Sequence, residues 1–163
     1  MLRTPLVLAL TALCLSSCAA AAPNGAAESA SRLLAAALRN DRVAFEAEID
    51  RAAVRDDVRR QVADLARSTA LEVDGGPSEF ALDRMISPDA VRIVDGSGHR
   101  PAEAPSAREV AGLMKVVDGS RVCLPDARPH GDCLLTFAKR RDHWRLVGMR
   151  AMDLRIEVAS AGG

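Results

Sequence analysis

Apolar residues recur at helical spacing through the first half of the chain. The strongest pattern follows Asp50, where they stand four, four and three positions apart, at Val54, Val58, Val62 and Leu65. Charged residues occupy most of the positions between them. Such a stripe predicts an amphipathic helix with one buried face, and Asp50 is a favoured N-cap residue for its start.

Shorter helical patterns flank this stripe. Residues 31–40 contain a run of Leu and Ala, and Ser29 or Ser31 is a candidate cap for that helix. After the break at 75–77, Ser78 is a candidate cap for a further helix. Ser87 followed by Pro88 is typical of another helix start, because Pro suits the first helical turn. We therefore expect helices up to about Val94.

The pattern becomes β-like after this point. Residues 108–117 predict a short helix that passes into a strand. Residues 121–124, 133–140 and 144–152 are rich in β-branched, aromatic and large apolar residues, and hairpin-type connections separate them. Residues 154–158 are a possible last strand. We predict an α+β fold in which the N-terminal helices pack on a C-terminal antiparallel meander of three to four strands.

The first residues have a different composition, without the amphipathic pattern of the helices. Arg3 precedes about ten mostly apolar residues, a stretch typical of a signal peptide and too short to span a bilayer. The tetrapeptide that ends at Cys18, Leu-Ser-Ser-Cys, resembles the lipobox of bacterial lipoproteins. That resemblance implies that the Cys18 thiol receives a diacylglyceryl group, that a peptidase cuts before Cys18, and that the new amino group is acylated, for example with palmitate. The alternative is an ordinary secretory signal cut near the following alanines.

Four segments follow from this interpretation. We expect a lipoprotein signal peptide at 1–17, a flexible tether at 18–27, a single α+β domain at 28–158 and a disordered tail at 159–163. Ala19 stands where many lipoproteins of the inner membrane carry aspartate. By the same resemblance, the expected location is the bacterial cell envelope, anchored by lipid in the outer membrane and facing the periplasm.

Charge and aromatic content narrow the classes of partner. The chain has 22 basic and 22 acidic residues, three Phe, one Trp and no Tyr. Nucleic-acid binding depends on excess positive charge and, for single strands, on aromatic platforms. We therefore expect no nucleic acid, and the membrane reached through Cys18 is the first expected partner. The basic run 139–141 is expected to be a solvated turn, or else to touch anionic lipid headgroups.

Three features resemble a known family. A short helix ends in Ile49-Asp50, Val54-Arg55 opens a long helix, and residues 85–91 read MISPDAV. Together they resemble the uncharacterised bacterial family called domain of unknown function 2939, although Arg51-Ala52 replaces that family's Phe-Pro. The resemblance implies no activity. The order of helices and meander is also similar to folds of the nuclear-transport-factor-2 type, which often enclose an apolar pocket. We therefore expect a binding or interaction module for an envelope protein or an apolar ligand.

One short cluster contains the residue types of a hydrolytic triad. Asp95, Ser97 and His99 lie in the sequence DGSGH, but no Gly-x-Ser-x-Gly elbow is present, and triads assemble from separate segments. A turn is the favoured interpretation. A small envelope hydrolase using Ser97 and His99 is the alternative. No motif for a cofactor or a metal-dependent enzyme occurs, so we expect no catalytic residue, metal or cofactor.

Two cysteines remain once Cys14 leaves with the signal peptide and Cys18 is acylated. Cys123 and Cys133 flank a Pro-rich connection between two predicted strands. In an oxidising compartment, a hairpin would bring them within reach of a disulfide. Two free thiols are one alternative. A metal site that adds His130 and Asp126 or Asp132 is the other.

Overall fold

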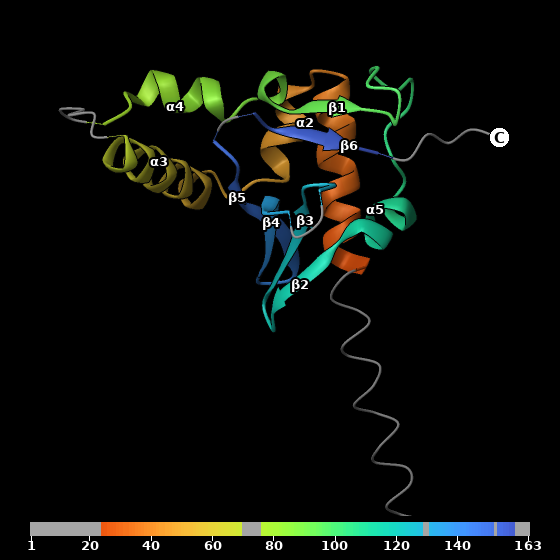
Figure 1. Cartoon of the computed structure of the whole chain (residues 1–163). Helices are drawn as coiled ribbons and strands as arrows, with labels where there is room; N and C mark the ends of the chain where they lie inside the picture. The colour runs from red at the N-terminus through yellow and green to blue at the C-terminus, as the bar shows by residue number, and fades with distance from the viewer. Residues whose placement is uncertain (1–23, 70–75, 129–130, 152, 159–163) are drawn as a thin grey trace, which may run out of the picture.

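The computed structural model describes residues 24–69, 76–128, 131–151 and 153–158 (Figure 1). Within them, helices come first and a four-stranded antiparallel sheet follows, which confirms the α+β prediction. The first helix covers residues 24–38. It is followed by α2 (Arg42–Ala47), α3 (Arg51–Ser68) and α4 (Glu79–Met85).

Side-chain caps start three of these helices. The side chains of Asp41, Asp50 and Ser78 each accept a hydrogen bond from the backbone N–H three residues further on. Asp50 therefore caps α3, as its position before the apolar stripe predicts. Ser29 and Ser31 do not cap the first helix, because both lie inside it.

The meander consists of β2 (Lys115–Asp118), β3 (Arg121–Pro125), β4 (Cys133–Arg140) and β5 (His143–Met149), in that order across the sheet. Helix α5 (Ala107–Leu113) leads directly into β2, so the predicted passage from helix to strand is confirmed. Ser106 and Glu109 form a capping box at the start of α5. The sequence carries this Ser-x-x-Glu signal, although no cap was predicted at Ser106.

A second, two-stranded sheet was not predicted. After the 3-10 turn η1 (Pro88–Ala90), the chain forms β1 (Arg92–Val94) rather than a helix, and β1 pairs in parallel with β6 (Arg155–Glu157). The expected last strand therefore exists, but it does not extend the meander. Backbone bonds from Arg92 N to Leu154 O and from Val158 N to Val94 O join the two strands. Local pattern cannot reveal a partner about 60 positions away.

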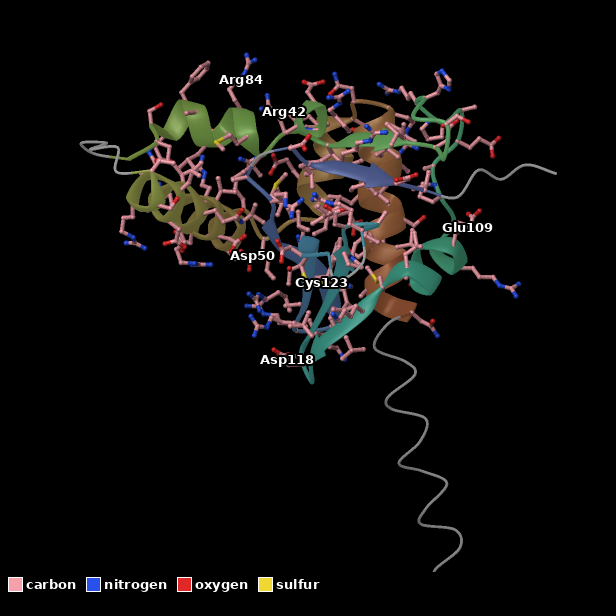
Figure 2. All side chains as sticks on the ribbon, in the orientation of Figure 1. Arg42, Asp50, Arg84, Glu109, Asp118 and Cys123 are labelled. Carbon is pink, nitrogen blue, oxygen red and sulfur yellow. A yellow bond between two sulfur atoms is a disulfide. The ribbon has the colours of Figure 1, made fainter. Side chains whose placement is uncertain are left out.

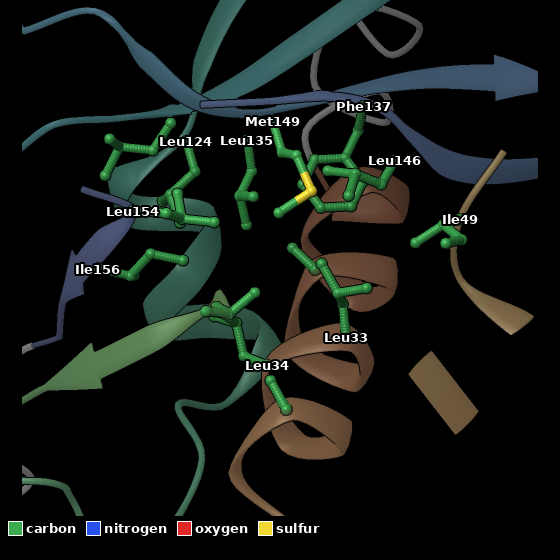
Figure 3. Close-up of a cluster of buried hydrophobic side chains, with 14 of the residues drawn as sticks. Leu33, Leu34, Ile49, Leu124, Leu135, Phe137, Leu146, Met149, Leu154 and Ile156 are labelled. Carbon is green, nitrogen blue, oxygen red and sulfur yellow. The ribbon is translucent and has the colours of Figure 1, made fainter. Parts of the chain in front are cut away.

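The core lies between the first helix and the two sheets. Leu33 and Leu34 point from the helix toward Leu135 and Phe137 of the meander and Ile156 of β6, and all five are fully or almost fully buried (Figure 3). The tether expected at 18–27 is contradicted over its last four residues. These residues are helical, and Ala26 and Ala27 are fully buried. Alanines at helical spacing here form part of the core rather than a flexible link.

Helices α3 and α4 form an arm that extends to one side of the body (Figure 1). Only the first half of the predicted stripe is buried, at Val54 and Val58, whereas Leu65 is 46% exposed. Ion pairs take over along the arm, where Arg51 and Arg55 contact Asp83, and Arg55 and Arg59 contact Glu79. Ion pairs from the first half of α3 thus join the two helices of the arm.

Candidate functional site

The cluster Asp95, Ser97 and His99 forms a turn. The Asp95 carboxylate accepts hydrogen bonds from the backbone N–H groups of Ser97 and His99, both at 2.9 Å, and the Asp95 N–H donates to the His99 carbonyl at 2.7 Å. The backbone bond from His99, and then that from Ser97, hold the pKa of the Asp95 carboxyl below its usual range. Ser97 and His99 are exposed, and no hydrogen bond joins their side chains within the described residues. The geometry is that of a turn rather than a nucleophile–base pair.

The two remaining cysteines are joined. Cys123 and Cys133 form a disulfide with Cα atoms 5.6 Å apart, linking β3 to β4. Asp126 receives hydrogen bonds from Arg128 and Arg150, and the Arg128 guanidinium is the main reason that the pKa of Asp126 lies well below its usual range. His130 lies outside the described residues. Across the described part of the chain, no group of three or more His, Cys, Asp or Glu side chains is arranged to hold a metal ion. Because both cysteines are in the disulfide, the metal alternative has no thiolate ligands.

One end of the molecule gathers the features that bear on anchoring. The first helix begins no later than residue 24, and Gly25 lies against Trp144 at the start of β5. The β2–β3 and β4–β5 turns lie at this same end, because the strand register places them at one edge of the meander (Figure 1). Six positions separate Cys18 from residue 24, so these two Cα atoms are at most about 22 Å apart. We call this the anchor end.

Basic side chains stand at the anchor end. Lys139 and Arg141 are exposed at the β4–β5 turn, while Arg140 forms an ion pair with Asp50 at 2.9 Å. His143 is exposed beside them, as expected, and Trp144 packs against the hydrophobic core. The run 139–141 is therefore solvent-exposed, with Lys139 and Arg140 at the end of β4 and Arg141 in the turn that follows.

The opposite end carries a groove, formed by two adjoining open cavities. The larger, of about 700 Å³, lies between α2, the end of α4 and η1, and the smaller, of about 320 Å³, continues along β1. Asn40, Pro88 and Asp89 line both cavities. The charged residues of the combined lining are Asp89 and four arginines, which are Arg42, Arg84, Arg92 and Arg100. We call this feature the basic groove.

The arginines of the basic groove differ from most others in the chain. Ten arginines elsewhere form ion pairs with carboxylates, but within the described residues Arg42, Arg84 and Arg92 have no carboxylate within 4.0 Å. Arg42 and Arg84 point outward at the edge of the molecule (Figure 2). Arg100 donates to the Leu38 carbonyl at the end of the first helix. Three guanidinium groups are therefore free to meet a ligand.

Sequence reasoning missed this groove. Its arginines come from α2, α4, β1 and the segment after β1, and no local motif joins them. The whole chain is electrically neutral, which hides a local excess of positive charge. The apolar pocket that the resemblance implied is not what these cavities offer, because charged side chains line both.

Comparisons with known proteins do not assign the chain to a family. No family model, no curated protein and no solved structure matches it. The resemblance to domain of unknown function 2939 therefore stays an expectation based on the quoted motifs. None of the helices in the described residues has the length and apolar character needed to cross a bilayer.

Proposed function

We propose that this protein is a lipid-anchored bacterial envelope lipoprotein that acts as a non-catalytic binding module. Acylated Cys18 holds it in the outer membrane, and the domain faces the periplasm. The observation that carries the proposal is the course of the first helix, which runs from the anchor end to residues 37 and 38 of the basic groove. A helix over residues 24–38 is roughly 20 Å long, so the groove is held away from the membrane.

Two further observations support the envelope location. The Cys123–Cys133 disulfide fits an oxidising compartment, because such bonds are rare in the reducing cytosol. The short connection between Cys18 and the first helix fits an anchor that keeps the domain close to the lipid. Two or three acyl chains give stable anchoring, whereas one chain binds only marginally.

The test compares the two cysteines near the N-terminus. We expect Cys18→Ala to abolish incorporation of a clickable palmitate analogue and to leave an uncut precursor or release the protein from membranes. Cys14→Ala is the matched control, because Cys14 lies four positions upstream, within the segment that is removed. It should be labelled and fractionate like the wild type. Density-gradient separation of the inner and outer membranes then shows which membrane holds the labelled protein.

The outcomes separate clearly. A Cys18→Ala protein with wild-type mass and wild-type membrane fractionation would contradict the lipoprotein assignment. Release without any lipid labelling of the wild type would instead indicate an ordinary secretory signal. Labelled protein in the inner-membrane fraction would correct the location and leave the anchor in place.

A further inference from the structure

The basic groove follows a sheet edge that has no neighbouring strand among the described residues. In the two-stranded sheet of that part of the chain, β1 pairs only with β6. Val91, Arg92, Ile93 and Val94 all line the smaller cavity, and no residue of β6 does so. The groove therefore lies on the side of β1 that is turned away from β6. The register turns the backbone groups of Arg92 and Val94 toward β6, so on the outer side the N–H and C=O groups of Ile93 are the template for an added extended chain.

The walls of the groove combine small apolar surface with positive charge. Ala37 and Leu38 of the first helix lie opposite β1, and Pro88 lies between the two cavities. Four arginines and one aspartate give the lining a formal charge of about +3 by simple addition of side-chain charges. Guanidinium groups bind carboxylates through two parallel hydrogen bonds, which makes Arg the residue best suited to recognising them.

From these features we propose that the basic groove binds an acidic peptide segment of a partner protein, which adds to β1 as an extended strand. The backbone of the segment pairs with the free edge of β1. Alternate side chains point to opposite faces of such a strand, so apolar ones meet Ala37 and Leu38, while carboxylates face the arginines. This inference rests on the proposed function only for the location of the partner, which is the periplasm.

The composition of the groove favours a peptide over other polyanions. Among the described residues, no Phe, Trp or Tyr lines either cavity, so they offer no platform on which a nucleobase can stack. The free strand edge offers a backbone donor and backbone acceptors, and a peptide can satisfy both kinds, whereas an ionised polyphosphate has no donor for the carbonyl groups. Charge and backbone geometry thus point to the same class of ligand.

The experiment measures binding of fluorescein-labelled peptides to the purified mature protein by fluorescence anisotropy. The probe is the alternating peptide (Glu-Val)4, and (Gln-Val)4 is its uncharged counterpart. We expect (Glu-Val)4 to bind at least tenfold more tightly than (Gln-Val)4. N-methylation of alternate residues removes the N–H donors along one edge of the peptide. If the segment adds to β1 as a strand, this change should weaken the binding of (Glu-Val)4 by at least tenfold.

Variants then locate the site. Arg42→Gln combined with Arg92→Gln removes one charge from each cavity, and both side chains are exposed, so the fold should remain. We expect at least a tenfold loss of affinity for (Glu-Val)4. Arg108→Gln combined with Arg141→Gln is the matched control, because both residues are exposed and lie outside the groove. It should change the affinity by less than twofold.

Several results would overturn the inference. Equal losses in the two double variants would show attraction to positive charge in general. Equal binding of (Glu-Val)4 and (Gln-Val)4, or tighter binding of a labelled (dT)15 oligonucleotide, would show a different ligand class. Because binding is measured in solution, a failed lipid anchor leaves these results unaffected. If the peptide binds but the wild-type protein proves not to be lipidated, only the proposed anchor is rejected.

Discussion

Small residues decide how closely the first helix approaches the sheet. A Cβ added at Gly25 would lie 2.8 Å from Cδ1 and 2.9 Å from Nε1 of the Trp144 indole ring. One turn further on, the buried Ser29 hydroxyl lies within hydrogen-bond distance of two acceptors, the Trp144 carbonyl oxygen at 2.9 Å and a Glu48 carboxylate oxygen at 2.8 Å. These contacts set the helix against the start of β5, and they therefore place the anchor end of the domain.

Gly25→Ala should destabilise the protein, although alanine is the better helix former. The indole ring cannot yield without disturbing the core, so we expect a loss of ~1–3 kcal/mol in the free energy of unfolding. Gly112→Ala is the matched control, because no described atom lies within 4 Å of the added methyl group in α5. The Gly112→Ala change should raise the free energy of unfolding by ~0.5–1 kcal/mol. Urea denaturation of both variants measures the difference, and two variants of equal stability would show that the Gly25–Trp144 contact is unimportant.

At the scale of the element, α3 shows how far a pattern extends beyond the packing that it predicts. The stripe is continuous from Val54 to Leu65, but only Val54 and Val58 are buried. Arg55 and Arg59, on either side of Val58, meet α4 through carboxylate pairs. Gln61 still hydrogen-bonds the backbone of Met149 and Ala151, and Val62 still packs against the core. Exposed ion pairs contribute little to stability, with a median of ~0–1 kcal/mol. The part of α3 up to Val62 therefore supports the fold, and the end that carries Leu65 is a far weaker contributor.

Two substitutions in α3 test this division. Val58→Asp places an unpaired charge in the core and should cost several kcal/mol, enough to prevent cooperative folding. Leu65→Asp introduces the same carboxylate seven residues further on, where the side chain is 46% exposed. It should change the free energy of unfolding by no more than ~0.5 kcal/mol. Thermal unfolding followed by circular dichroism checks both, and a soluble Val58→Asp protein with a cooperative transition would contradict the packing of that stripe.

The elements that the sequence predicted are those with local causes. Asp50 and Ser78 cap helices through bonds to residues three positions away, and the meander follows from consecutive hairpins. The parallel pairing of β1 with β6 depends on contacts between residues about 60 positions apart, so no local pattern contains it. The same reason hides the basic groove, because Arg42 and Arg92 meet only after folding. Alanines 26 and 27 were missed because an Ala-rich run resembles a linker in composition.

At the scale of the whole molecule, the disulfide makes stability depend on the compartment. The bond joins residues ten positions apart, and loop-closure entropy predicts a contribution of ~2.7 kcal/mol. We therefore expect the oxidised protein to be ~2–3 kcal/mol more stable than the reduced one, which fits a protein that works outside the cytosol.

Thiol titration and unfolding measure this directly. The mature protein, unfolded without reductant, should show no reactive thiol from Cys123 and Cys133. Reduction with a phosphine should expose two thiols and lower the urea midpoint. A double variant with Cys123→Ala and Cys133→Ala should have the same low urea midpoint as the reduced wild type. The phosphine should not change that midpoint. Two reactive thiols before reduction would reject the bond, and thiols that appear only after chelation would restore the metal alternative.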